Sequence, residues 1–108
     1  MAKAVFARKG NVVNYKAGSD VGYLDIVPFA GCIGVAEMDI AKGDVGSVSI
    51  AGAYRLPKAA GAIKAGAIVY YDTNGNNIVA ASGEKTVEAG IALEDAASDA
   101  VTVVVRIG

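Results

Sequence analysis

Residues 48–57, which read VSIAGAYRLP, form the stretch that decides the fold class. Apolar residues recur there at even spacing, at Val48, Ile50, Tyr54 and Leu56, with small or polar residues between them. This alternation is typical of a β-strand with one buried face, because successive side chains of a strand point to opposite sides. Proline cannot donate a hydrogen bond within a sheet, so we predict a strand that ends at Pro57.

The composition of the whole chain favours an all-β fold. The 108 residues include 15 Val and 9 Ile but only 3 Leu, and β-branched side chains prefer a pleated sheet. We predict one β domain over residues 1–108, a compact small β-barrel or β-sandwich of about seven to nine short strands. Residues 57–66 contain two glycines and are expected to form at most one short helical turn. The other expected strands lie within residues 12–15, 21–27, 33–38, 68–71, 78–80, 87–93 and 101–107.

A hairpin is predicted around Asn74-Gly75. The apolar stretches 68–71 and 78–80 flank the polar segment 72–77, and an Asn-Gly pair between two strands is a strong signal for a hairpin turn. The spacing of Asp72, Asn74 and Asn76 imitates the start of a calcium loop. That interpretation is rejected because the sixth and twelfth positions carry Asn77 and Gly83 instead of the required Gly and Glu.

The distribution of charge sets the N-terminus apart. The net charge is −1, but residues 1–19 carry four basic side chains and no acidic one, whereas residues 20–108 carry six basic and eleven acidic ones. Residues 1–9 are therefore interpreted as a basic arm that docks on an acidic partner surface; a merely solvated arm is the alternative. No nucleic-acid partner is expected, because the basic residues are few and lack interleaved aromatics.

The chain lacks the residue types that most enzymes and metal sites need. It has no histidine and a single cysteine, Cys32, which lies among apolar neighbours and is expected to be inert. Ser82 and Lys85 have the spacing of a serine–lysine pair, but without its supporting motifs. Glu94 and Asp95 are adjacent carboxylates in a polar loop. We predict no catalytic, cofactor-binding or metal-binding residue.

No membrane partner is expected, since no apolar stretch approaches the length of a signal peptide or a spanning helix. Tyr54, Tyr70 and Tyr71 are instead candidates for a subunit interface. Tyr70 and Tyr71 are consecutive on a predicted strand and must face opposite sides, so one is expected in the core and the other exposed or covered by a partner.

Four segments of the chain resemble the capsid cement proteins of tailed bacteriophages, which are small head decoration proteins. Residues 48–58 resemble the family's strand ending in a Leu-Pro-Lys corner, and residues 65–72 resemble the Gly-led Val-Tyr strand that follows. Residues 88–96 are similar to its Gly-x-Ala segment, and residues 101–107 to its terminal strand. The resemblance covers residues 10–108.

The resemblance implies a compact β fold, often trimeric, on the outside of an expanded head, with no catalytic residues to transfer. The expected partners are the major capsid protein and further copies of the chain as a homotrimer. The expected location is the capsid exterior of the virion, after synthesis in the cytoplasm of the bacterial host.

A capsid-binding role for the arm is the most specific hypothesis. An extended arm can add a strand to an exposed sheet edge of the shell. The residues expected to make the contact are Lys3, Val5, Phe6, Arg8 and Lys9. A tail without a partner, or a strand of the protein's own sheet, is the alternative for the arm. A small-ligand or glycan-binding β module is the alternative for the whole protein, and an enzyme using Glu94 and Asp95 is a third possibility.

Overall fold

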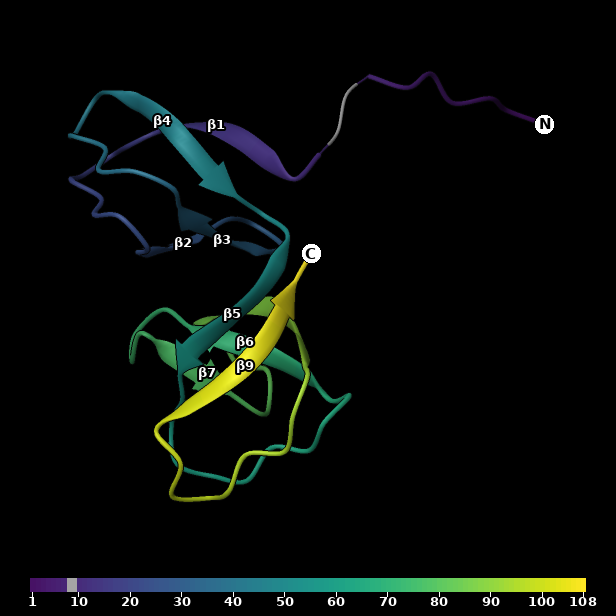
Figure 1. Cartoon of the computed structure of the whole chain (residues 1–108), viewed down its shortest axis with the longest axis vertical. Helices are drawn as coiled ribbons and strands as arrows, with labels where there is room; N and C mark the ends of the chain where they lie inside the picture. Colours follow the sequence, from purple (N-terminus) through teal and green to yellow (C-terminus); the bar gives the residue numbers. More distant parts are fainter. Residues whose placement is uncertain (8–9) are drawn as a thin grey trace.

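Nine β-strands in two antiparallel sheets make up the fold, seen here in a computed structural model that describes residues 1–7 and 10–108. The chain builds a four-stranded sheet first and a five-stranded sheet second, and the two are stacked in Figure 1. No helix occurs in the described residues, and neither sheet closes on itself. The predicted all-β fold is confirmed, and its architecture is sandwich-like.

The four-stranded sheet has two chemically different ends. Its order is β1-β4-β3-β2 and all neighbours are antiparallel, so loops 17–25 and 37–44 lie at one end. Loop 29–32, the start of β1 and the end of β4 lie at the other. We call the first the acidic end, because its two loops carry several exposed carboxylates, and the second the arm end, because the N-terminal segment enters the sheet there. The strands are β1 (Val12–Lys16), β2 (Ile26–Pro28), β3 (Ile33–Ala36) and β4 (Val45–Ser49).

The five-stranded sheet packs against the larger of the two hydrophobic cores. Its order is β5-β9-β8-β6-β7, with a register shift between Val69 and Tyr70 where β6 pairs with β8. An isolated bridge between Lys58 and Ile78 brings the two edges of this sheet together at one point, without making a barrel. The strands are β5 (Gly52–Pro57), β6 (Ile68–Asp72), β7 (Asn77–Val79), β8 (Thr86–Ala92) and β9 (Thr102–Ile107).

The predicted strand over residues 48–57 is in fact two strands in different sheets. β4 ends at Ser49 and β5 begins at Gly52, whose φ of 124° lies in a region that favours glycine. Val48 packs in the core of the first sheet and Leu56 in the core of the second. The even spacing therefore continues across the passage between the sheets, which is why the alternation conceals the break.

The predicted strand over residues 21–27 is largely wrong. Only residues 26–28 form a strand there, because residues 22–25 make a turn in which Leu24 has a φ of 70°. Residues 57–66 contain no helix, within the predicted limit of one short helical turn, and are held by bridges at Lys58 and Ile63. The predicted hairpin, by contrast, is confirmed by β6 and β7.

The two cores meet at β3. Ile33 and Val35 belong to the core of the five-stranded sheet, whereas Ala36 packs in the smaller core of the four-stranded sheet. β3 is buried along its whole length. This strand therefore joins the two layers.

Candidate binding surfaces

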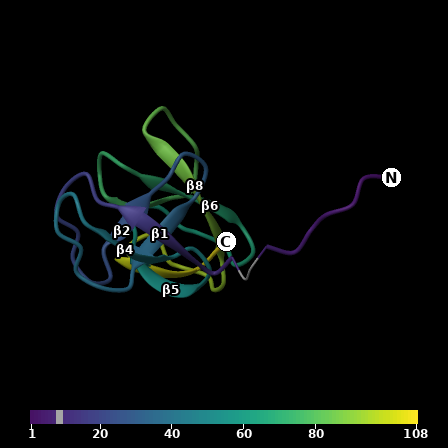
Figure 2. The same cartoon turned by 90° about the horizontal axis from the view of Figure 1, so that it is seen from above.

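The N-terminal arm extends away from the body. Residues 1–7 are exposed, form no strand and make no hydrogen bond with the rest of the described chain. Figures 1 and 2 show this segment leaving from the start of β1. Val5 is 90% exposed and Phe6 is 82% exposed, with Lys3 beside them. Arg8 and Lys9 lie outside the described residues. An exposed apolar pair flanked by basic residues is suited to a contact with another macromolecule.

A second apolar feature is the turn at residues 22–25, at the acidic end. Tyr23 is 62% exposed and Leu24 is 55% exposed. The backbone amide of Tyr23 donates to Asp39 Oδ1 at 2.8 Å, and that of Leu24 donates to the carbonyl oxygen of Ala36 at 2.8 Å. The amide of Gly22 donates to Asp25 Oδ2 at 2.7 Å. Every backbone amide of the turn has an acceptor, because that of Asp25 donates to the carbonyl oxygen of Gly22.

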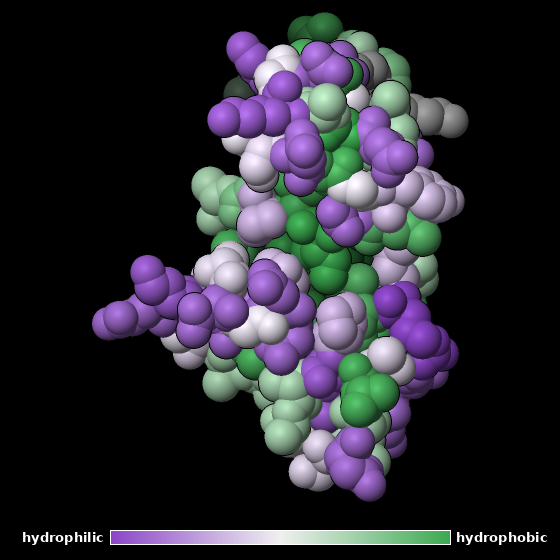
Figure 3. Space-filling model, turned by 90° about the vertical axis from the view of Figure 1, so that its left-hand side faces the viewer, coloured by the Kyte–Doolittle hydropathy of each residue, from purple (hydrophilic) through white to green (hydrophobic). Residues whose placement is uncertain are grey.

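Two open depressions, of about 430 and 460 Å³, flank Leu24 where the sheets meet. Figure 3 looks onto the acidic end and shows hydrophobic surface between the two layers, with hydrophilic side chains around it. The first depression is lined by Leu24, Asp25, Ile26, Pro57, Tyr71 and Asn76, and the second by Tyr23, Leu24, Val35, Ala36, Glu37 and Tyr54. The sequence does not reveal this surface, because the pattern of residues 21–27 predicts a continuous strand there.

A third depression lies at the arm end and is mainly apolar. It is open and shallow, with a volume of about 510 Å³. Phe29, beside it, packs edge-to-face against Tyr15 at a centroid distance of 5.7 Å, which fixes one side of the depression. Cys32 is half-buried in its wall. The lining residues are Val13, Asn14, Phe29, Ala30, Gly31, Cys32 and Ile50.

The tyrosines divide between the core and two surfaces. Tyr71 is 5% exposed and packs in the core, and half-buried Tyr70 pairs across the outer face with Glu88 and Val79, so the prediction that the two face opposite sides is confirmed. Burial, and then the charges of Asp25 and Asp72, raise the pKa of Tyr71 above its ordinary value. Tyr54 and Tyr71 reach the surface at the depressions beside Leu24.

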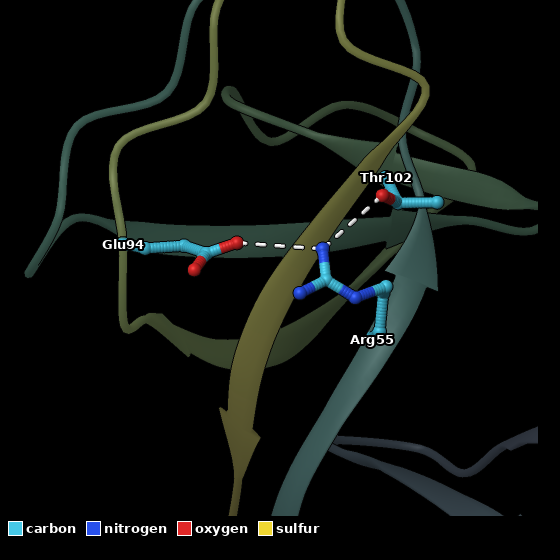
Figure 4. A network of polar contacts seen from close by, with 3 residues as sticks. All are labelled: Arg55, Glu94 and Thr102. Atoms are coloured by element: carbon cyan, nitrogen blue, oxygen red, sulfur yellow. Dashed lines mark hydrogen bonds and ion pairs between the residues drawn. The ribbon is translucent and has the colours of Figure 1, made fainter.

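The adjacent carboxylates Glu94 and Asp95 have separate structural partners. Glu94 Oε1 lies 3.5 Å from Arg55 Nη1, which also donates to Thr102 Oγ1 at 3.4 Å (Figure 4). Asp95 Oδ1 accepts a hydrogen bond of 2.8 Å from the backbone amide of Ala65. Both are exposed, and this arrangement is that of two surface carboxylates that hold strands and loops in place.

The described residues contain no group of three or more metal-ligating side chains. Over the same part of the chain, no helix is long and apolar enough to cross a membrane. The features described above are exposed apolar side chains, open depressions and surface charges on the two sheets, together with the extended arm. These features define a small all-β protein with surfaces suited to contacts with other proteins.

The chain belongs to the phage cement protein family: the family model, described as phage cement protein, matches residues 7–107. This is a family of structural capsid proteins, and membership associates the chain with the phage capsid and the virion. The match confirms the resemblance to capsid cement proteins. No curated protein and no solved structure matches the chain significantly.

Proposed function

We propose that this protein binds the outside of an expanded phage head and stabilises the capsid lattice. The observation that carries the proposal is the family match over residues 7–107, which spans both sheets. A decoration protein acts by avidity, because many small contacts repeated over a lattice hold neighbouring shell subunits together. Residues 1–108 would act as one unit on the capsid exterior, after synthesis in the cytoplasm of the bacterial host.

The arm is the proposed contact with the major capsid protein. Its exposed Val5 and Phe6 are apolar anchors, and Lys3, Arg8 and Lys9 would pair with acidic side chains of the shell. Residues 1–7 are extended and form no strand of their own sheet, which leaves their backbone groups free to pair with a sheet edge of the shell. This exposure supports the arm as a binding element.

The proposed assembly is a homotrimer. Tyr54 and Tyr71 open onto the depressions at the acidic end, and Tyr70 lies half-buried on the outer face of the five-stranded sheet. Aromatic side chains of this kind are enriched at the centres of protein interfaces. Tyr54 and Tyr70 would contribute contact area directly, whereas Tyr71 would contribute through its exposed edge.

Co-sedimentation with expanded and unexpanded heads of the phage that encodes the protein tests the proposal. We expect saturable binding to expanded heads alone. Deletion of residues 2–9, or replacement of Val5 and Phe6 by Ser, should weaken binding without changing the melting temperature. Val101→Ser is the matched control, because it also replaces an exposed apolar residue by serine, at a position 76% exposed and outside the arm.

Two outcomes would overturn parts of this proposal. Unchanged binding after deletion of residues 2–9 would exclude the arm as the contact. Absence of binding to either form of the head, together with specific retention on a glycan array, would favour the alternative of a small-ligand or glycan-binding module.

A further inference from the structure

The two ends of the four-stranded sheet are complementary to each other. We infer that the Tyr23–Leu24 turn of one copy docks into the apolar depression at the arm end of a second copy. We call the turn the knob, comprising residues 22–25, and the depression the socket, lined by Val13, Phe29, Ala30, Gly31, Cys32 and Ile50 among others. This inference rests on the proposed self-association and names the surfaces that produce it.

The knob is preformed. Leu24 has a φ of 70°, a conformation that is unfavourable for a leucine and that persists only because the surrounding hydrogen bonds impose it. Asp39, from the loop after β3, and Ala36, at the end of β3, supply two of those bonds. A strained backbone that presents two large apolar side chains to solvent is the kind of feature that clusters at functional sites. Its rigidity also lowers the entropy lost on binding.

The socket has the chemistry to receive such a knob. Its exposed area is mostly apolar, and it lies between β1 and the loop that joins β2 to β3. Phe29 is held by its edge-to-face contact with Tyr15, so one wall is fixed. Gly31 belongs to the lining, and a Cβ added there would meet nothing within 4 Å, so a side chain can be placed at this position without a clash.

Charge favours the pairing of one end with the other. Loops 17–25 and 37–44 of the acidic end carry five exposed carboxylates, with Lys42 as the one basic residue of these two segments and Lys16 at the end of β1 beside them. The lining of the socket includes no acidic side chain, so the acidic end meets no like charge there. Two acidic ends that face each other would repel, which disfavours a symmetric knob–knob contact. The five carboxylates belong to Asp20, Asp25, Glu37, Asp39 and Asp44.

Because knob and socket lie at opposite ends of the sheet, the contact is head-to-tail. Such a contact uses two different surfaces of each copy and generates a ring when the rotation between copies closes. The proposed trimer would be a ring of this kind. A contact between two knobs would instead be symmetric and would leave every socket empty.

Two single variants test the inference. Leu24→Asn removes the apolar tip and should not destabilise the fold, since Asn tolerates a positive φ better than Leu. Gly31→Glu fills the socket and adds a negative charge that would face the acidic end. We expect each variant to raise the dissociation constant for self-association by about tenfold or more, measured by sedimentation velocity and native mass spectrometry. Gly31→Ala and Val101→Ser should associate like the wild type.

Mixing the two variants gives the decisive result. Gly31→Glu retains an intact knob and Leu24→Asn retains an intact socket, so an equimolar mixture should form mixed dimers that neither variant forms alone. A symmetric knob–knob contact predicts no such rescue and an unaffected Gly31→Glu variant. Either of these results would overturn the inference, as would a wild type that stays monomeric at all concentrations.

These measurements need no phage heads, so they are independent of the test of capsid binding. If the protein binds heads but its variants self-associate like the wild type, the proposed function stands and the knob-and-socket contact is refuted. If the variants behave as expected but the protein does not bind phage heads, the inference about assembly stands and the proposed function is refuted.

Discussion

Lys58 Nζ donates a hydrogen bond to the carbonyl oxygen of Ala100 at 3.3 Å, which ties the end of β5 to the loop that enters β9. The same ammonium donates to the carbonyl oxygens of Ala59 at 2.8 Å and Ser98 at 3.4 Å. The residue is only 7% exposed, and backbone carbonyl oxygens accept from all three donors of its ammonium group, as a buried charge requires.

Lys58→Met keeps the length and apolar stem of this side chain but removes the three donors. We expect a loss of about 1–3 kcal/mol in the free energy of unfolding, since the carbonyl oxygens of Ala59 and Ala100 lose this donor, whereas that of Ser98 keeps the amide of Gly61. Urea denaturation measures it, with the exposed Lys64→Met as the control. A loss equal to that of the control would show that the three hydrogen bonds contribute nothing.

Gly34→Ala should also destabilise the protein. A Cβ at this position would lie 2.5 Å from Val48 Cγ1 and 2.9 Å from the carbonyl oxygen of Ser49, inside the sheet where β3 pairs with β4. Overpacking of this kind costs about 1–3 kcal/mol. Thermal denaturation of this variant beside Gly31→Ala, whose Cβ has open space, separates the close approach from the general effect of replacing glycine.

Stability should fall in alkaline solution in a way that depends on Tyr71. Burial foremost, and then Asp25 and Asp72, raise its pKa above the ordinary 10.0, so the folded state holds the phenolic proton more tightly than the unfolded state. This stabilisation is complete below about pH 10 and is lost as the pH rises through the folded-state pKa. The wild type should therefore lose stability above pH 10 more steeply than Tyr71→Phe.

Denaturation at a series of pH values gives these slopes, and Tyr70→Phe is the matched control on the opposite face of β6. Tyr71→Phe also removes the hydrogen bond from Tyr71 Oη to Asn76 Oδ1, so its stability at neutral pH will be lower. The comparison therefore concerns the slopes alone. Parallel slopes for all three proteins would contradict the role assigned to Tyr71.

The two sheets should unfold together. Ile33 and Val35 stand on a strand of the first sheet but pack in the core of the second, which couples the two layers. We expect one calorimetric transition whose van't Hoff and calorimetric enthalpies agree. Val35→Ala should lower the melting temperature of that single transition. Two transitions, with only one sensitive to Val35, would mean that the sheets fold separately.

Local patterns were sufficient to predict most of the strands. The hairpin of β6 and β7 follows from two apolar stretches around Asn74-Gly75, and β9 follows from the run of β-branched residues in 102–107. The passage between the sheets was not predictable, because Val48 and Leu56 keep the same spacing although they face different cores. Which core a side chain joins is decided by tertiary packing, about which periodicity carries no information.

The binding surfaces were predictable only in part. The arm is visible in the sequence as a basic segment without acids, and the exposure of Val5 and Phe6 adds an apolar pair to it, while its docking on a partner stays a prediction. The knob was hidden, because Val21 and Ile26 on either side of residues 22–25 resemble a continuous strand. Its turn depends on acceptors from Ala36 and Asp39, which are distant in the sequence.

The half-buried position of Cys32 in the wall of the third depression has a practical consequence. It is the single thiol of the chain, so its rate of reaction with a maleimide reports on this one site without any engineered cysteine. A thiol covered by protein reacts more slowly than one that faces water. The rate of modification at rising protein concentration would therefore follow occupancy of the depression, in free solution and on assembled heads alike.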